Sequence, residues 1–206
     1  MLLNRLEKEQ YIIVDNLFTK KDQRVIKDNL FDPFFPWYLI EHRNKKQKFS
    51  SLPKISKQKN VEEYVKFVHL FSEGDKNSSK YSEIITSMIK VILQKFKLNE
   101  LQIIRAKANL QTSNTKTKKN KHSSPHVDMN EDHFVILYYV NNSDGDTRIF
   151  DKTTTDGDPI GLNCIGQFEP SKGRSLVFKS NRFHCSAPPV KHKNRMVLNF
   201  VMQIAT

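Results

Sequence analysis

The chain has little cysteine, little glycine and no long apolar run. Only Cys164 and Cys185 occur among its 206 residues, which excludes a disulfide framework and a four-thiolate metal site. We expect both to be reduced thiols. No apolar stretch approaches the roughly 20 residues that a membrane helix needs, and the opening MLLNRLEKEQ lacks the apolar core of a signal peptide. These absences predict a soluble, cytoplasmic protein without membrane contact.

The rest of the composition is that of a folded chain. Hydrophobic residues make up 37% and aromatic residues 10%, enough for a packed core. The length predicts a single domain over residues 1–206. The net charge of +12 is compatible with an anionic partner such as nucleic acid or an acidic small molecule. It is equally compatible with a lysine-rich composition that serves no partner.

The hydrophobic pattern changes near residue 100. Before it, residues 11–18 read as a strand, and Thr19 is placed as the N-cap of a following helix. Apolar residues at three- and four-residue spacing predict two more helices, over 61–73 and 79–96. The two prolines within residues 31–39 predict an irregular segment, and the polar, basic residues 44–60 predict a loop or hairpin.

After residue 100, short apolar runs are separated by Gly, Asp, Asn, Ser and Pro, with no helical pattern between them. Many short strands predict a mainly-β fold, a sandwich or jelly roll, with flanking α-helices from the first half. Residues 101–206 would form this core, and residues 1–100 a strand plus supporting helices. The low-complexity residues 112–125, rich in lysine, predict a loop.

The stretch HVDMN holds the first candidate site residues. His126 and Asp128 are one residue apart, so on an extended backbone both side chains point to the same face. His184, between two apolar strands, offers a third ligand. Two histidines and one carboxylate form the facial triad that leaves coordination positions of Fe(II) open. The alternative to a metal site is an ordinary polar strand end. His133 competes as a ligand, whereas His122 and His192 are expected to be solvated.

Arg195 opens the last apolar strand. Its guanidinium could hold a carboxylate through two parallel hydrogen bonds. An ordinary arginine on an edge strand is the alternative.

These motifs, in this order, resemble the Fe(II)- and 2-oxoglutarate-dependent dioxygenases, specifically the prolyl 4-hydroxylase-like branch. The resemblance covers residues 101–204 and runs through HVD, LYYVN, DGDTRIFD, EPSKGRSLVF, FH and the basic Arg195. The opening YIIVDNLFTKKD also looks like the family's first strand and helix. Gly145 and Asp146 stand where the family often has paired glycines. The resemblance implies a double-stranded β-helix, or jelly-roll, core.

Residue by residue, the resemblance implies that His126, Asp128 and His184 bind iron. It implies that Arg195 pairs with the distal carboxylate of 2-oxoglutarate, with Tyr139 as a second contact. Three further residues lie near the cosubstrate positions of the family, although sheet packing explains them equally: Thr147, Asn199 and Asn109. The implied cofactors are Fe(II) and 2-oxoglutarate, with ascorbate as a supporting reductant.

The implied activity is a dioxygenase that uses molecular oxygen, hydroxylates a substrate and converts 2-oxoglutarate to succinate. A peptidyl-proline or another protein side chain is the substrate closest to the resemblance. A nucleic-acid demethylase is the rival, because Lys116, Lys118, Lys119 and Lys121 precede the site. A free amino acid or small metabolite also stays open. Two alternatives lack this activity, namely a noncatalytic jelly-roll module and a cupin-like zinc or manganese protein.

Overall fold

The computed structural model describes residues 2–40, 61–62, 64–74, 76–77, 79–113, 121–131, 133–156 and 161–204. The expected loop or hairpin at 44–60 lies outside these ranges, as do residues 114–120 of the basic loop. The lysines 116, 118 and 119 therefore also lie outside the described residues.

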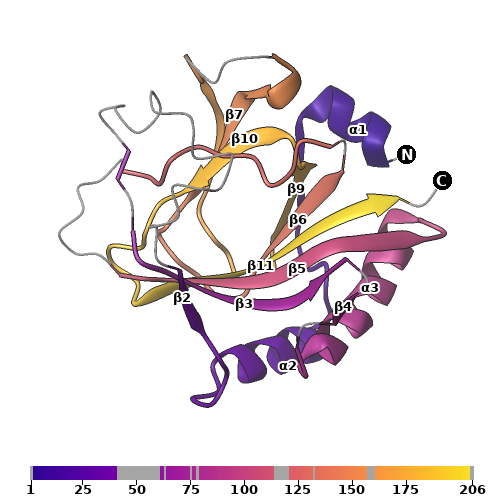
Figure 1. Ribbon diagram of the computed structural model, residues 1–206, viewed down its shortest axis with the longest axis vertical. Coiled ribbons are helices and arrows are strands. Elements are labelled where there is room, and N and C mark those ends of the chain that lie inside the picture. The colour runs from indigo at the N-terminus through magenta and orange to yellow at the C-terminus, as the bar shows by residue number, and fades with distance from the viewer. Residues whose placement is uncertain are drawn as a thin grey trace.

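Two antiparallel sheets form the architecture. The larger sheet has eight strands in the order β1 (Tyr11–Val14), β9 (Ser175–Lys179), β6 (Phe134–Tyr139), β11 (Asn194–Ile204), β5 (Leu101–Thr112), β3 (Lys66–Glu73) and β2 (Tyr38–Ile40), with β4 (Lys76–Asn77) paired to β3. The smaller sheet has the order β10 (Arg182–Ser186), β7 (Thr147–Thr153) and β8 (Cys164–Phe168). Figure 1 shows β7 and β10 across one side of the large sheet and α2 and α3 along the other.

The central strand β6 shows how the two faces of the large sheet are used. All six of its residues are buried, since both faces are covered. Phe134, Ile136 and Tyr138 belong to the core shared with the helices. Val135, Leu137 and Tyr139 pack instead with Ile149 of the small sheet. The continuous apolar run in this strand thus reflects burial on two sides, and the second face is the one that carries the candidate site.

Three helices lie in the described part, α1 (Leu2–Glu9), α2 (Lys20–Leu30) and α3 (Ser82–Phe96), and a short 3₁₀-helix, η1 (Thr154–Asp156), follows β7. Thr19 caps α2 as predicted, because its hydroxyl accepts the backbone N–H of Asp22 at 3.2 Å and the Asp22 carboxylate accepts the Thr19 N–H. The predicted stripe of α3 places Ile85, Met88 and Ile92 in the core.

The expected fold class is confirmed: the chain is mainly β with flanking helices, and the two facing sheets are consistent with a jelly roll. The prediction of a helix over 61–73 is wrong, because β3 covers Lys66–Glu73. Pairing with the long strand β5 overrides the three- and four-residue apolar spacing there. The single-domain organisation over residues 1–206 stays a prediction.

The strand expected over 11–18 is β1, which ends at Val14. The irregular segment expected over 31–39 ends in the short edge strand β2. No helix in the described part of the chain is both long enough and apolar enough to cross a membrane.

Candidate active site

His126, Asp128 and His184 lie together, with one ligand atom of each within 4.8 Å of the others. His126 and Asp128 come from the connection between β5 and β6, and His184 comes from β10. This is the one group of three or more potential metal ligands that the described residues contain. The sequence-predicted triad is therefore assembled from segments that are far apart along the chain.

Backbone hydrogen bonds hold the connection that carries His126 and Asp128. The N–H of His126 donates to the carbonyl of His184, and the N–H of His184 donates back, each at 2.9 Å. The N–H of Asp128 donates to the carbonyl of Ser180 at 3.0 Å, in the turn between β9 and β10. The two ligand-bearing segments are thereby fixed to each other.

The imidazoles are oriented by backbone carbonyls. Nδ1 of His184 lies 3.0 Å from the Arg182 carbonyl oxygen, and Nδ1 of His126 lies 3.2 Å from that of Ser124. A carbonyl only accepts, so Nδ1 carries the proton in both rings and Nε2 keeps its lone pair. Nε2 of His184 lies 3.6 Å from Oδ2 of Asp128. Such backbone contacts fix metal-ligating histidines in the required tautomer.

The electrostatics of the triad favour the metal-binding protonation states. Desolvation lowers the pKa of His126 to about 3, and the neighbouring His184 adds to the shift. Desolvation also lowers the pKa of His184, against the opposing effect of Asp128. Burial opposes ionisation of Asp128, but Lys107, His184 and Arg105 together hold its pKa below the ordinary value. Two neutral imidazoles and one carboxylate are therefore present at neutral pH.

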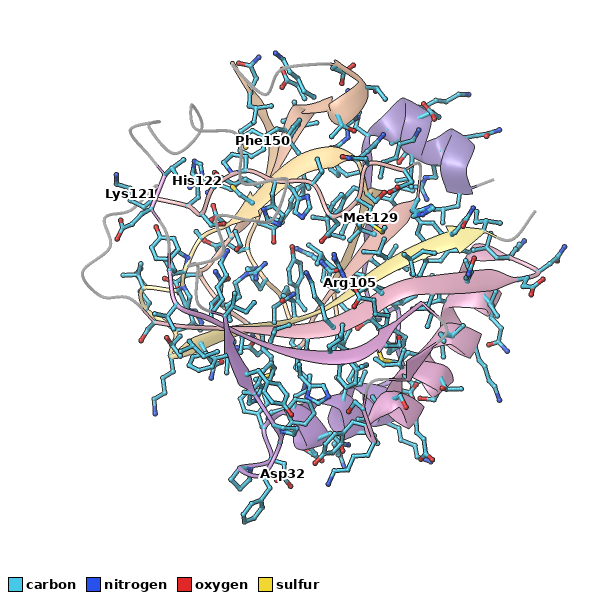
Figure 2. The ribbon with its side chains drawn as sticks, in the orientation of Figure 1. Asp32, Arg105, Lys121, His122, Met129 and Phe150 are labelled. Carbon is cyan, nitrogen blue, oxygen red and sulfur yellow. The ribbon has the colours of Figure 1, made fainter. Side chains whose placement is uncertain are left out.

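Both oxygens of Asp128 accept hydrogen bonds from the large sheet. Arg105 on β5 donates to Oδ1 at 2.6 Å, and the Lys107 ammonium lies 3.7 Å from the same atom. Asn199 on β11 donates its side-chain amide to Oδ2 at 3.0 Å. Figure 2 shows Arg105 on the side of β5 that faces away from α3. The carboxylate is thus held in one orientation beside the two histidines.

Arg195 is buried on the same face of the large sheet. Its guanidinium donates to the Gly145 carbonyl at 2.8 Å, to the Gln111 side-chain oxygen at 3.1 Å and to the Thr147 hydroxyl at 2.8 Å. These acceptors are neutral, and none of the carboxylates in the described part forms an ion pair with Arg195. Burial lowers the pKa of Arg195, although Tyr139 and Asp146 oppose the shift.

Gly145 allows this close approach. A Cβ atom at position 145 would lie 2.7 Å from the Ala187 carbonyl oxygen and 3.0 Å from Cδ of Arg195. The glycine is therefore required by the packing around Arg195, and the turn works with one glycine where the family often has two.

The other residues predicted to contact the cosubstrate lie in different parts of the site. Tyr139 donates its hydroxyl proton to Thr147 at 2.9 Å, so both residues lie beside Arg195. Asn199 instead contacts Asp128. Asn109 faces Val197 across the β5–β11 pair, and its side chain forms no hydrogen bond within the described ranges. The structure is compatible with the packing alternative for Asn109, and its role towards the cosubstrate stays a prediction.

Sequence reasoning missed Arg105, Lys107 and Gln111. The signal was available, because the alternation of β5 places these residues on one face, and the register sets Gln111 opposite Arg195 and Lys107 opposite Asn199. Nε2 of Gln111 is buried and has no hydrogen-bond partner among the described residues. This unpaired donor beside Arg195 fits a ligand that carries a carboxylate.

The histidines His122 and His133 and the thiol of Cys185 lie outside the triad. The prediction that His122 is solvated is wrong, because this residue is buried, with Nδ1 2.9 Å from the Ser123 carbonyl oxygen. His133 lies outside the ligand group. Cys185 is a free thiol that packs with Phe150 and Phe183, on the face of β10 opposite His184.

The sequence matches the model of the 2OG-Fe(II) oxygenase superfamily over residues 110–203. No curated protein gives a significant match. Among solved structures, the fold is similar to a 2OG-Fe(II) oxygenase family oxidoreductase from Burkholderia pseudomallei, with 12% identity and a TM-score of 0.63 over 98% of this chain and 89% of that one.

Two further structures share the fold. One is the non-heme alpha-ketoglutarate-dependent epimerase SnoN from nogalamycin biosynthesis, with 11% identity and a TM-score of 0.62 over 100% of this chain and 82% of that one. The other is a prolyl hydroxylase from Trichoplax adhaerens, solved with a hypoxia inducible factor peptide, with 12% identity and a TM-score of 0.57 over 98% of this chain and 87% of that one.

At these identities the structural matches show the fold, and the sequence match over residues 110–203 shows similarity to the family in that segment. The matched segment contains the assembled group of two histidines and one aspartate. This similarity supports an oxidoreductase. Residues 110–203 of this chain match the 2OG-Fe(II) oxygenase superfamily, whose members use Fe(II) and 2-oxoglutarate.

Proposed function

We propose that this chain is an Fe(II)- and 2-oxoglutarate-dependent dioxygenase in which His126, Asp128 and His184 bind the metal and Arg195 binds the distal carboxylate of 2-oxoglutarate. The observation that carries the proposal is the convergence of the three ligands on one face with a buried guanidinium that has only neutral acceptors. When bound, Fe(II) with 2-oxoglutarate would supply the oxidation of a substrate C–H bond by O₂, coupled to decarboxylation to succinate.

The contribution of Arg195 follows from its surroundings. A buried cation without a counter-ion is unfavourable, so a ligand carboxylate that pairs with it gains a charge-assisted interaction in a site with little water. The Gln111 amide supplies a second donor. Thr147 accepts from both Arg195 and Tyr139, which holds the guanidinium and the phenol in place.

The placement of Arg195 relative to the triad supports a bridging cosubstrate. Arg195 and Asn199 lie on the same face of β11, four residues apart, or about 13 Å along an extended strand. Asn199 contacts the metal-ligand candidate Asp128. One dicarboxylate reaching from the triad towards Arg195 would therefore use both ends of this face.

Hydroxylation is the outcome that we propose for the substrate. A structural neighbour that is a prolyl hydroxylase favours a peptidyl-proline or another protein side chain. Another neighbour is an epimerase. Product analysis distinguishes the two outcomes, because hydroxylation adds one oxygen atom to the substrate, whereas epimerisation leaves its mass unchanged.

The first test is an anaerobic titration of the purified protein with Fe(II) and then 2-oxoglutarate, followed by visible absorption of the chelate. We expect a metal-to-ligand charge-transfer band that the double variant His126→Ala/Asp128→Ala lacks. Arg195→Ala should require more 2-oxoglutarate to reach half of the signal. Arg5→Ala, an exposed change on α1, is the matched control and should behave like the wild type.

The result that contradicts the proposal is bound Fe(II) with no band at saturating 2-oxoglutarate. A band that is unchanged in the double variant would contradict the assignment of the ligands. Bound metal without the band would make a noncatalytic or cupin-like metal protein the better description.

A further inference from the structure

Arg105 and Lys107 place two basic groups beside Asp128, and the triad needs neither as a ligand. The Arg105 guanidinium lies 2.6 Å from Oδ1 of Asp128, and the Lys107 ammonium lies 3.7 Å from it. The side chains of Arg105 and Lys107 retain 23% and 22% of their exposure, against 2% for Asp128. The two cations are therefore recessed, but part of each can still be reached from solvent.

Arg105 has hydrogen-bonding capacity left over. Its Nε atom is buried and has no hydrogen-bond partner within the described part of the chain. The carboxylate of Glu73, which lies opposite Arg105 in the β3–β5 register, is exposed and forms no ion pair with it. A guanidinium with an unused N–H next to a recess is suited to a planar anion such as a carboxylate, or to a phosphate.

The charge balance of the proposed active site also favours an anion beside Arg105 and Lys107. The charges of Fe(II), Asp128, Arg195 and dianionic 2-oxoglutarate cancel. Arg105 and Lys107 then have no compensating carboxylate in the described residues other than the Asp128 already counted. An anionic group of the substrate would offset part or all of this positive charge.

The register separates this pair from the site proposed for 2-oxoglutarate. Gln111 lies opposite Arg195, whereas Lys107 lies opposite Asn199 and Arg105 opposite Val201. Arg105 is therefore farther from Arg195 along the sheet than Lys107 and Asn199 are. Two anionic groups could occupy the two ends of this face at the same time.

We propose that Arg105 and Lys107 bind an anionic group of the substrate, and that the substrate is a compact molecule bearing a carboxylate or a phosphate. This inference rests on the dioxygenase activity proposed above and, for its substrate, favours a small acidic molecule over the peptidyl-proline considered there. An anion held by these two side chains lies close to Asp128, so the reacting carbon is only a few bonds from the anionic group. A neutral prolyl peptide would leave Arg105 and Lys107 to share the single carboxylate of Asp128.

The test uses the full chain with Zn(II), which is redox-inert, and saturating 2-oxoglutarate. The Nε–H resonance of Arg105, assigned by its loss in Arg105→Lys, is followed by NMR during titration with propionate, methyl phosphate or uncharged propionamide. We expect a saturable shift with propionate or methyl phosphate and none with propionamide. The anion that binds more tightly identifies the source of the charge.

Two variants sharpen the result. Lys107→Gln should weaken binding of the anion about tenfold, the size of one lost charge-assisted hydrogen bond. Arg5→Gln removes an exposed positive charge from α1 and should leave the affinity unchanged. No shift with either anion, an equal shift with propionamide, or an unchanged affinity in Lys107→Gln would overturn the inference.

The Fe(II)–2-oxoglutarate absorption band distinguishes failure of this inference from failure of the proposed function. A normal band with no anion binding means that Arg105 and Lys107 serve only to orient Asp128, and the dioxygenase proposal stands. Absence of the band at saturating Fe(II) and 2-oxoglutarate removes the dioxygenase proposal and the substrate role together, even where the anion binds.

Discussion

Asn199 of β11 is joined to Asp128 by a hydrogen bond of 3.0 Å from its side-chain amide to Oδ2. The bond links the central region of the large sheet to the connection that carries two of the three candidate ligands. Asn199 is itself buried, and its Oδ1 atom has no hydrogen-bond partner within the described ranges. The amide is thus turned with its donor towards the carboxylate.

Replacing Asn199 by alanine is expected to weaken metal binding by about tenfold to a hundredfold, the usual cost of losing a group that orients a ligand. Competition with a chromophoric chelator under anaerobic conditions measures this change. Asn109→Ala is the matched control, because Asn109 lies on the same face but does not contact Asp128. Equal losses in both variants would argue that Asn199 acts through general packing.

Replacing Thr147 by valine should reduce both stability and affinity for 2-oxoglutarate. The change keeps the shape of the side chain but removes the oxygen that accepts from Arg195 and Tyr139. Leaving buried donors unpaired costs about 1–3 kcal/mol of the free energy of unfolding. Denaturant unfolding and the 2-oxoglutarate titration measure the two effects, and Fe(II) affinity should not change.

Thr86→Val provides the control for this substitution. Thr86 lies on the exposed side of α3, and its hydroxyl donates to the Ser82 carbonyl. We expect a change within about 0.5 kcal/mol there. If Thr147→Val were equally silent, the hydroxyl would have no role in holding Arg195.

His69 predicts a pH dependence of stability that is separate from the metal ligands. It is buried, with Nδ1 2.8 Å from the Pro36 carbonyl oxygen and Nε2 2.7 Å from the Ser79 hydroxyl. Desolvation lowers its pKa, and the Pro36 hydrogen bond opposes the shift. The unfolded chain therefore binds more protons than the folded chain below the unfolded value of about 6.5.

Stability should consequently fall as the pH drops through about 6.5, by at most about 1.4 kcal/mol per pH unit from this one histidine. His69→Asn keeps a donor for the Pro36 carbonyl but does not titrate. Urea unfolding of both proteins between about pH 7.5 and about pH 5 should show a shallower dependence of stability on pH for the variant. Parallel slopes would mean that His69 titrates alike in both states.

Ile92→Ala tests the core between α3 and the large sheet. Ile92 has no exposed surface, and removing a side chain of this size from a core costs about 2–5 kcal/mol. Val25→Ala on α2 is the comparison, since Val25 is 47% exposed and should cost less than about 1 kcal/mol. Chemical denaturation gives both values, and similar losses would contradict the packing described for α3.

The triad could be predicted because its spacing reflects strand geometry. The interval between His126 and Asp128, and the position of His184 between two apolar runs, carried enough information to name all three residues. The surroundings of Asp128 could not be predicted in the same way. Arg105 and Lys107 reach it only because β5 pairs with β11 in a particular register, and register between distant strands is not written in local sequence.

In the fold as well, features set by local sequence could be predicted, and features set by pairing between distant segments could not. The Thr19 cap and the apolar stripe of α3 are local signals, and the structure confirms both. The segment that forms β3 has a spacing that suits either a helix or a strand, and the choice is made by its partner β5. The burial of His122 could not be predicted, because its sequence neighbours are basic and polar while its contacts come from the fold.

The reciprocal backbone bridge between His126 and His184 has a consequence for motion. It joins β10 of the small sheet to the connection that Arg105 and Asn199 hold against the large sheet. A metal ion bound by His184 of the small sheet and by His126 and Asp128 of this connection would link the two sheets. The amide hydrogens of His126 and His184 should then exchange with solvent more slowly when the metal is bound. Their exchange rates would report how often the two sheets separate locally, and hence whether the metal site is filled.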